Sequence, residues 1–326
     1  MIITQTPMRI SLGGGGTDLP FYYKRKGGLL VTATINKSVF VAVKEKFEKE
    51  IKLVYAKTEV VSSAKEIQNE RAREALKLIG IENGVEINVM SDLPTRTGLG
   101  GSASFLVGLL HALHLFKGEF PSKRTLAEEA CKIEMDILKY PVGKQDQYAV
   151  SYGGIIQMKI DKEGVVTVEP LDISKDTVEE LENNLMLFYT GITRDSVKIL
   201  EEQKNTIESN NDRIKYMDEI KKIGKDIKKC LEKGNTDKFG KLLNLHWENK
   251  RKITKEMSNT QIDKWYELAL KNGAFGGKII GAGGGGFLMF YCKYDRENFI
   301  KTMVNSGLKY IPFKFDWDGT KVLVNS

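Results

Sequence analysis

A glycine-rich stretch at residues 93–104 reads Leu-Pro-Thr-Arg-Thr-Gly-Leu-Gly-Gly-Ser-Ala-Ser. The alternating segment 85–91 before it predicts a β-strand, and the apolar run 102–116 after it is long enough for a buried helix. A glycine loop that opens a helix directs unpaired backbone N–H groups and the positive end of the helix dipole at one point. The stretch therefore predicts a binding site for a triphosphate. Its residues are Gly98, Leu99, Gly100, Gly101, Ser102, Ala103 and Ser104.

Ser102 stands at the start of the expected helix and has two interpretations. Its hydroxyl is placed to bind a Mg²⁺ ion that accompanies the phosphates. The alternative is a helix N-cap, a position that Ser commonly occupies. Because the glycines around it favour a ligand site, we expect Ser102 to serve the metal.

Glycines also gather at 13–16 and 281–286, each time beside a β-rich segment. Glycine adopts positive φ and lets the backbone approach a ligand closely, so three such clusters favour a ligand site over ordinary turns. The third cluster matches G-x-G-x-x-G from Gly281 to Gly286, but the strand-like segment 287–291 follows it. A dinucleotide fingerprint requires a helix there, and the chain contains no G-x-x-x-x-G-K-[ST] loop. Both of these nucleotide-binding classes are therefore disfavoured.

Four charged residues near the glycine clusters are candidates for chemistry. Glu134 lies on a predicted helix, 126–138, and Asp146 follows it. Mg²⁺ prefers hard oxygen ligands, and phosphoryl transfer needs a group that orients or deprotonates the attacking hydroxyl, so two acids can fill these roles. Taken alone, each acid is more often a surface salt-bridge partner. Arg9 and Asp18 flank the first glycine cluster, a pattern that favours ligand contact over turn chemistry.

The composition is typical of a globular protein, with 41% hydrophobic and 29% charged residues in a chain of 326. The 50 basic and 43 acidic side chains give a net charge of +7. The excess is spread over both halves, so we expect no nucleic-acid partner, whereas an anionic substrate is favoured. No apolar run approaches the roughly 20 residues that span a bilayer, and no signal peptide is visible. We therefore expect a cytoplasmic protein without a membrane partner; three scattered cysteines argue against disulfides or a zinc site.

The pattern of expected elements changes near residues 172–182, and we place a boundary there between two domains, 1–175 and 176–326. Mixed runs of strands and helices without regular βαβ alternation predict an α+β fold. The expected strands are 2–4, 8–12, 29–35, 39–43, 52–55, 85–91, 155–160, 165–168, 185–189, one from 278 onward, and 287–291. The expected helices are 63–79, 102–116, 126–138, long Lys- and Glu-rich helices between about 196 and 233, and further helices at 236–250 and 261–271.

Three motifs together resemble those of the GHMP kinases, a family that includes galactokinase, homoserine kinase, mevalonate kinase and phosphomevalonate kinase. Segment 7–20 resembles the first motif and reads Pro-Met-Arg-Ile-Ser-Leu-Gly-Gly-Gly-Gly-Thr-Asp-Leu-Pro. Segments 98–104 and 278–287 resemble the second, phosphate-binding motif and the third motif. Their order and spacing agree over nearly the whole chain. The resemblance implies a two-domain GHMP-kinase fold, with a ribosomal-protein-like N-terminal β/α domain and a ferredoxin-like C-terminal domain.

The resemblance also implies ATP as phosphate donor and Mg²⁺ as metal. It implies that Asp146 is the catalytic base with Arg9 as its basic partner, and that Ser102 and Glu134 bind the metal. Asp18 takes the role of contacting a sugar hydroxyl. Further substrate-binding positions in the first and third motifs are Gly15, Gly16, Thr17, Gly283 and Gly284. Many members have Ser where this chain has Gly101, so the metal-side hydroxyl of the loop is left to Ser102 alone.

Segments 14–20 and 142–148 most resemble the branch of heptose-7-phosphate kinases and fucokinases. This implies ATP-dependent phosphorylation of the anomeric hydroxyl of a sugar phosphate, a heptose 7-phosphate, on the way to nucleotide-activated heptose for surface polysaccharide. The phosphate that such a sugar already carries lies away from the reacting hydroxyl and needs a cation to bind it. We rank Arg194 as the first candidate and the basic run 24–26 as the second. The alternative for that run is a solvated loop.

Two other functions stay open. Kinases of unphosphorylated fucose or galactose share the catalytic motifs, so a sugar without a phosphate is an alternative substrate. A non-catalytic regulator that binds nucleotide or sugar is a second alternative, although such a protein is expected to lose the acid or metal groups. The sequence leaves the oligomeric state open.

Overall fold

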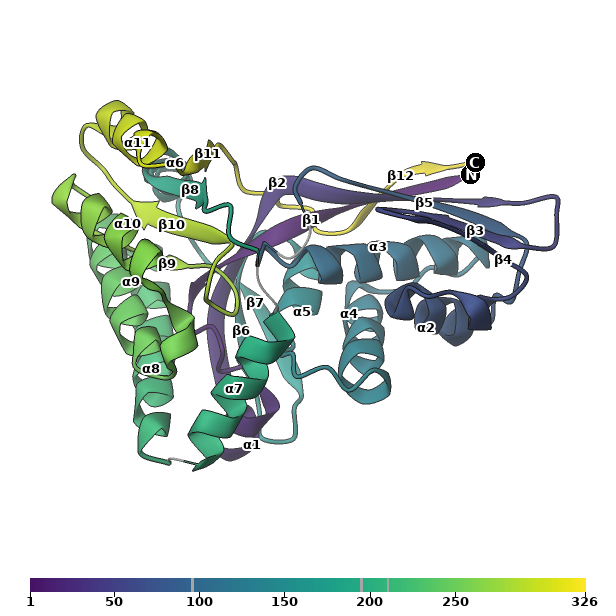
Figure 1. The fold of residues 1–326 in the computed structure, drawn as a ribbon, viewed down its shortest axis with the longest axis horizontal. Helices are drawn as coiled ribbons and strands as arrows, with labels where there is room; N and C mark the ends of the chain where they lie inside the picture. Colours follow the sequence, from purple (N-terminus) through teal and green to yellow (C-terminus); the bar gives the residue numbers. More distant parts are fainter. Residues whose placement is uncertain (95–96, 194–195, 210) are drawn as a thin grey trace.

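Two long antiparallel strands, β1 (Ile2–Gly13) and β2 (Gly28–Glu45), form the spine of the molecule (Figure 1). The computed structural model describes residues 1–94, 97–193, 196–209 and 211–326. The sequence predicted two separate strands, 29–35 and 39–43, where the structure has the single strand β2. The register of β1 against β2 shifts between Pro7 and Met8, opposite the break expected at 36–38, so an irregularity bends the ladder without ending it.

Within the described residues, an eight-stranded sheet is built on this pair, in the order β12-β1-β2-β5-β3-β4. The length of β2 lets it pair with β6 along its first half and with β5 along its second half. The strand β7 adds to β6, which gives the hairpin that the sequence predicted. The further strands of this sheet are β3 (Ile51–Val54), β4 (Thr58–Val61), β5 (Val85–Ser91), β6 (Ile155–Ile160), β7 (Val166–Pro170) and β12 (Lys321–Asn325).

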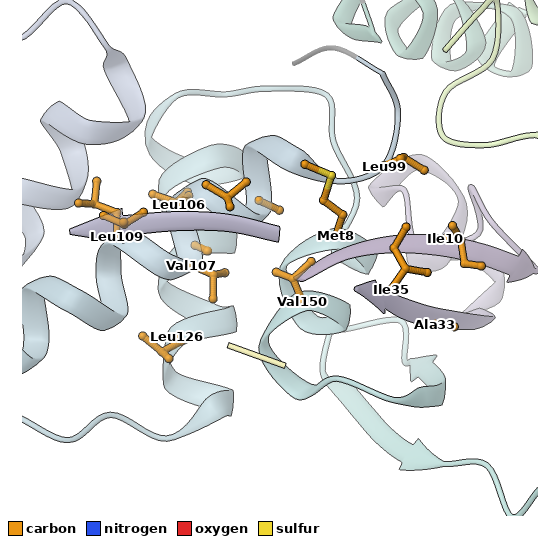
Figure 2. Packing of buried hydrophobic residues seen from close by; sticks show 14 of the residues in the cluster. Met8, Ile10, Ala33, Ile35, Leu99, Leu106, Val107, Leu109, Leu126 and Val150 are labelled. Carbon is orange, nitrogen blue, oxygen red and sulfur yellow. The ribbon is translucent and has the colours of Figure 1, made fainter. Parts of the chain in front are cut away.

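Helices α2 to α5 cover one face of this sheet (Figure 1). The small and apolar run predicted to be a buried helix is α3 (Gly101–Phe116), which packs on both β1 and β2. Figure 2 shows part of the core between them, with Met8 and Ile10 from β1 and Leu106 from α3. The other helices of this half are α1 (Pro20–Lys26), α2 (Glu70–Ile79), α4 (Lys123–Cys131) and α5 (Gln145–Tyr152).

Two local features of these helices depart from the predicted bounds. The helix expected from residue 63 begins at Glu70, because the side chain of Asn69 accepts a hydrogen bond from the N–H of Ala72 and caps α2 there. A 3-10 turn (Ala64–Glu66) precedes it. The helix expected over 126–138 changes character at its end, where α4 continues as a π-helix (Lys132–Ile137).

The second sheet contains four antiparallel strands in the order β11-β8-β10-β9. Numbered along the chain this order is 4-1-3-2, and helices connect the first strand to the second and the third to the fourth, which is the ferredoxin-like arrangement. These strands are β8 (Leu185–Tyr189), β9 (Gly276–Ile279), β10 (Phe287–Tyr291) and β11 (Lys309–Ile311). The helices of this half are α6 (Lys175–Asn184), α7 (Ser196–Ser209), α8 (Ile214–Glu232), α9 (Thr236–Arg251), α10 (Thr260–Lys271) and α11 (Arg296–Asn305), with 3-10 turns at Asn211–Arg213 and Lys255–Met257.

The boundary predicted at 175/176 falls between the strands of the two sheets, but the two halves are interleaved. Strand β12, near the end of the chain, pairs with β1 in the first sheet (Figure 1). Helix α8 packs on β1 and β2, where Gly224 lies against Gly14. Neither contact was predicted, because both join segments about 200 residues or more apart. In the described part of the chain, no helix combines the length and apolar character needed to cross a membrane.

Candidate active site

A cavity of about 170 Å³ lies where the three glycine clusters meet. Its walls come from β1, the loop after it, the π-helix, the start of α5, and the pair formed by α9 and β9. The glycine loop 97–100 that leads into α3, called the phosphate loop below, completes them. The lining residues used below are Arg9, Ser11, Gly15, Gly16, Asp18, Arg71, Gly98, Gly100, Gly101, Ser102, Ala103, Glu134, Gln145, Asp146, Gln147, His246, Lys250, Lys278, Gly281 and Ala282.

The phosphate loop enters α3 through glycines in the left-handed region. Gly100 is the N-cap of α3 with φ of +77°, and an added Cβ there would meet Cγ of Arg9 at 3.1 Å. Ser102 is exposed, and no side chain caps this helix in the described structure, so the N-cap interpretation of Ser102 is wrong. The N–H groups of the first turn have no intrahelical acceptor. This corner of the cavity therefore presents backbone donors and one hydroxyl.

Two residues of the expected phosphate loop face away from the cavity. Leu99 is buried in the core, and its carbonyl accepts a hydrogen bond from the N–H of Arg9 at 2.9 Å. The hydroxyl of Ser104 is buried and donates to the carbonyl of Pro7 at 2.8 Å. Leu99 and Ser104 thus attach the loop to β1, and the cavity is lined by Gly98, Gly100, Gly101, Ser102 and Ala103.

Arg9 and Asp146 form a two-pronged ion pair at the centre of the site. Nε and Nη2 of Arg9 donate to the two carboxylate oxygens of Asp146 at 2.8 and 2.7 Å. Nη1 of Arg9 donates to the carbonyl of Gly98. The Arg9 side chain is 5% exposed, whereas that of Asp146 is 32% exposed and lies in the first turn of α5. The pair therefore fixes the carboxylate while leaving part of it open to a ligand.

Asp18 is a second carboxylate on the cavity wall, and it is buried. It accepts hydrogen bonds from the N–H of Gly16 at 3.1 Å and of Gln145 at 3.0 Å. Burial raises the pKa of Asp18 above its ordinary value, and the negative charge of Asp146 adds to this rise. The backbone hydrogen bonds act in the opposite direction but are outweighed. Gly143 lies so close that a Cβ there would overlap the Asp18 carboxylate. The backbone thus holds the Asp18 carboxylate in one position.

Glu134 is held by two side chains that the sequence did not single out. Nε of Arg71 donates to its Oε1 at 2.8 Å, and Nη2 of Arg71 lies 2.7 Å from the same oxygen in an ion pair. Nε2 of Gln147 donates to Oε2. A carboxylate has about four lone-pair sites, so Oε2 keeps acceptor capacity. Mg²⁺ commonly takes one or two protein carboxylates together with phosphate oxygens and water. The oxygen donors of Ser102 and Glu134, on one cavity, fit such an ion.

Comparison of the chain with known proteins shows the family to which it belongs. Residues 59–154 match the model of the GHMP kinases N terminal domain, and residues 227–309 match that of the GHMP kinases C terminal domain. The chain is 30% identical to a D-glycero-alpha-D-manno-heptose 7-phosphate kinase of Campylobacter jejuni, over 98% of each chain. The chain belongs to the GHMP kinase family.

Other relatives and a solved structure of GHMP type agree with this. A galactokinase of Pyrococcus furiosus is 27% identical over 72% of this chain and 71% of its own. The crystal structure of a D-glycero-D-manno-heptose 1-phosphate kinase from Bacteroides thetaiotaomicron is similar with a TM-score of 0.82, at 25% identity and 99% coverage of both chains. The predicted family and the two-domain α+β fold are thereby confirmed. GHMP kinases use ATP as phosphate donor, and this chain is a sugar-kinase homologue.

The remaining residues expected to bind substrate divide into those that line the cavity of this GHMP kinase and those that do not. Gly15 and Gly16 line the cavity, but Thr17 is buried and its hydroxyl bridges the carbonyls of Gly14 and Leu29. We therefore assign Thr17 to holding the loop on β2.

The third motif lines the cavity with its first residues and not with the two glycines that were expected there. Gly281 and Ala282 line it, whereas a Cβ on Gly283 or Gly284 would meet Met257 and Glu256, so these two glycines pack on the 3-10 turn. The two candidates for a distal phosphate have different outcomes. Arg194 lies outside the described residues and stays a prediction. The basic run 24–26 is exposed on α1 and does not line the cavity.

Sequence reasoning missed most of the polar residues that complete the kinase cavity. Ser11 Oγ, Gln145 Nε2, Gln147 Oε1 and both ring nitrogens of His246 are buried without a hydrogen-bond partner in the described residues. All four residues line the cavity. A signal existed for three of them, because Ser11 lies two residues from Arg9 on one strand face, and the two glutamines flank Asp146. His246 had no such signal.

Proposed function

We propose that this GHMP kinase transfers the γ-phosphate of ATP to the anomeric hydroxyl of a sugar, with D-glycero-α-D-manno-heptose 7-phosphate as the substrate. The observation that carries the reaction type is the Asp146 carboxylate, fixed by Arg9 and partly open, beside a glycine loop at a helix N-terminus. The choice of sugar is supported by the relative from Campylobacter jejuni, which matches over 98% of both chains.

In this mechanism the phosphate loop binds the donor. The N–H groups at the start of α3 and the helix dipole hold the phosphates. Ser102 and Glu134 would hold Mg²⁺, which when bound would neutralise charge on the phosphate oxygens. Arg71 keeps the Glu134 carboxylate in place from the far side.

Asp146 acts on the acceptor. The anomeric oxygen forms a bond to the γ-phosphorus while the bond from that phosphorus to the oxygen of the leaving ADP breaks, and the proton of the hydroxyl passes to Asp146. Arg9 orients the Asp146 carboxylate through two hydrogen bonds and places positive charge beside the transferred group. Asp18, oriented by the N–H groups of Gly16 and Gln145, accepts hydrogen bonds from other hydroxyls of the sugar. Catalysis is then mostly positioning and electrostatics.

A second candidate, a kinase of an unphosphorylated sugar, is supported by the galactokinase relative and by an L-fucokinase/L-fucose-1-P guanylyltransferase of Bacteroides fragilis. The latter is 26% identical over 89% of this chain, which spans 34% of that longer protein. Turnover measured side by side with heptose 7-phosphate, fucose and galactose separates the two candidates. We expect kcat/KM to be highest for heptose 7-phosphate by at least tenfold. A higher value for fucose or galactose would replace the proposed substrate. ATP binding without turnover of any of them would favour a non-catalytic regulator.

A further inference from the structure

Three basic side chains from the C-terminal half line one wall of the cavity. His246 and Lys250 are four residues apart on α9 and therefore project from the same face of that helix. Lys278 comes from β9, which packs on α9. All three line the same cavity as Asp146 and Asp18. We call His246, Lys250 and Lys278 the basic cluster.

Two members of the basic cluster, Lys278 and His246, are buried without a side-chain partner among the described residues. Lys278 is 2% exposed, and no described residue forms an ion pair or a hydrogen bond with its ammonium group. His246 is 1% exposed, and neither ring nitrogen has a partner among the described residues. Lys250 donates a hydrogen bond to the carbonyl of Gly281. Burying a charge without a partner is costly, and an anion bound in the cavity would supply the partner that the described residues do not give to Lys278 and His246.

The positive charges of the basic cluster indicate that a ligand bound there is negatively charged. Burial lowers the pKa of Lys278 well below its ordinary value, and the positive charges of Lys250 and Arg9 lower it further. Burial likewise lowers the pKa of His246, and Lys278 and Lys250 add to the effect. These groups therefore repel each other through space, and an anion between them removes the repulsion. A phosphate dianion suits two lysines, which bind phosphate as point charges through short charge-assisted hydrogen bonds.

The position of the basic cluster bears on which phosphate it holds. In Figure 1, α9 and β9 lie on the opposite side of β1 from α3, whose N-terminus carries the phosphate loop. The donor's phosphates already have the backbone N–H groups of that loop. The basic cluster adds a second group of anion ligands on the wall that belongs to the C-terminal half.

We propose that the basic cluster binds the phosphate that the sugar substrate already carries, which makes this enzyme a kinase of sugar phosphates. The inference rests on the proposed function and names the residues that hold the phosphate of its substrate. Lys278 and Lys250 thereby take the role that the sequence suggested for Arg194 or for the run 24–26. A terminal phosphate of ATP is the other source of the same chemistry, and the experiment distinguishes the two.

The first measurement needs no sugar. The melting temperature of the full chain is followed as inorganic phosphate is added, with saturating Mg²⁺ and AMPPNP, a non-hydrolysable ATP analogue, and with chloride at matched ionic strength as reference. A ligand that binds only the folded state raises the melting temperature. We expect phosphate to raise the melting temperature of the wild type. In Lys278→Met, most of this rise should be lost. Lys24→Met, which removes an exposed lysine of α1, should behave as wild type.

The second measurement is kinetic. We expect Lys278→Met to raise KM for heptose 7-phosphate by at least tenfold, while KM for ATP changes less than twofold. Lys278→Gln, which keeps a polar side chain, provides the same test if Lys278→Met does not fold. A loss of AMPPNP affinity as large as the loss for the sugar phosphate would overturn the assignment to the acceptor, as would a phosphate effect that persists in both variants.

Failure of the proposed function has a different signature. If the wild type turns over only unphosphorylated sugars, the proposed substrate is wrong and the basic cluster does not hold an acceptor phosphate. The response to inorganic phosphate then still reports, by itself, whether Lys278 binds an anion. Turnover of heptose 7-phosphate with unchanged kinetics in Lys278→Met would instead leave the proposed function intact and overturn only the role of the basic cluster.

Discussion

Gly286, the last glycine of the third cluster, packs directly on the carbonyl oxygen of Thr97 at the start of the phosphate loop. An added Cβ at Gly286 would lie 2.2 Å from that oxygen, and its φ is +84°. The contact joins the turn between β9 and β10, in the second sheet, to the loop that opens α3. The third glycine cluster therefore positions the second one, and the two halves of the kinase are fixed to each other beside the cavity.

Gly286→Ala is expected to destabilise the protein and to displace the phosphate loop. The left-handed backbone alone costs a non-glycine residue about 1–2 kcal/mol, and the clash with Thr97 adds to it. Gly80→Ala is the matched control, because Gly80 has φ of +72° and open space around the added Cβ. Urea unfolding should show a clearly larger loss for Gly286→Ala, accompanied by weaker binding of AMPPNP. Equal losses for the two variants would mean that the contact with Thr97 yields easily.

Asp146→Asn is expected to lower kcat by about 100-fold or more, the range of a positioned general base. The change keeps the size of the side chain but removes the negative charge and the proton acceptor. AMPPNP affinity should change little, because the donor is held by the loop before α3. Asp172→Asn, at an exposed position after β7, controls for the loss of one carboxylate. Nearly full kcat in Asp146→Asn would restrict Asp146 to a structural role.

Ser102 and Ser104 form a natural pair for testing the metal site. Ser102→Ala removes an exposed hydroxyl from the cavity, so we expect a higher Mg²⁺ concentration at half-maximal activity and an almost unchanged melting temperature. Ser104→Ala removes a buried hydrogen bond to Pro7, worth about 0.5–1.5 kcal/mol, so we expect the opposite outcome. Mg²⁺ titrations and thermal melts on both variants check this. A normal Mg²⁺ titration in Ser102→Ala would remove Ser102 from the metal site.

His114 is expected to make stability depend on pH. Burial opposes its protonation, but hydrogen bonds to Glu129 at 2.8 Å and Glu119 at 2.6 Å outweigh burial and raise its pKa. A raised folded-state pKa stabilises the protein below the unfolded value near 6.5, and this stabilisation is lost as the pH rises through the folded value. The difference in melting temperature between wild type and His114→Gln should therefore shrink from pH 7 to pH 9.

His111, one helical turn away, is the control for that titration. Burial, together with His114, lowers the pKa of His111 to about 4, so it is neutral in the folded protein throughout the same range. The melting difference between wild type and His111→Gln should stay constant from pH 7 to pH 9. A difference for His114→Gln that also stays constant would show that its carboxylate partners do not hold it protonated.

The parts of the kinase that the sequence predicted are those with local signatures. The helix after the phosphate loop was predicted within one residue because its apolar run is continuous, and Arg9, Asp18, Glu134 and Asp146 lie on one cavity as their motifs suggested. Glycine density indicated where backbone approaches backbone or ligand, but it did not distinguish the two. Gly281 lines the cavity while other glycines of the same cluster pack on protein.

The parts that could not be predicted depend on contacts between distant segments. His246 and Lys250 lie in the predicted helix 236–250, whose several lysines are typical of a solvated face, and only the packing of α9 on β9 turns them toward the cavity. Strand β12 has no partner nearby in sequence and finds β1 across the whole chain. Short helices such as α1 and α5 lack a full period of apolar residues, so periodicity did not detect them.

The π-helix that carries Glu134 is equivalent to a single residue inserted into an α-helix. The N–H of Leu138 donates to the carbonyl of Ile133, five residues back, so this turn is one residue wider than an α-turn. Deleting one residue from the turn would let α4 continue as a regular helix, but every later side chain would rotate by about 100° around the axis. A residue removed ahead of Glu134 would therefore turn its carboxylate away from Arg71 and Gln147.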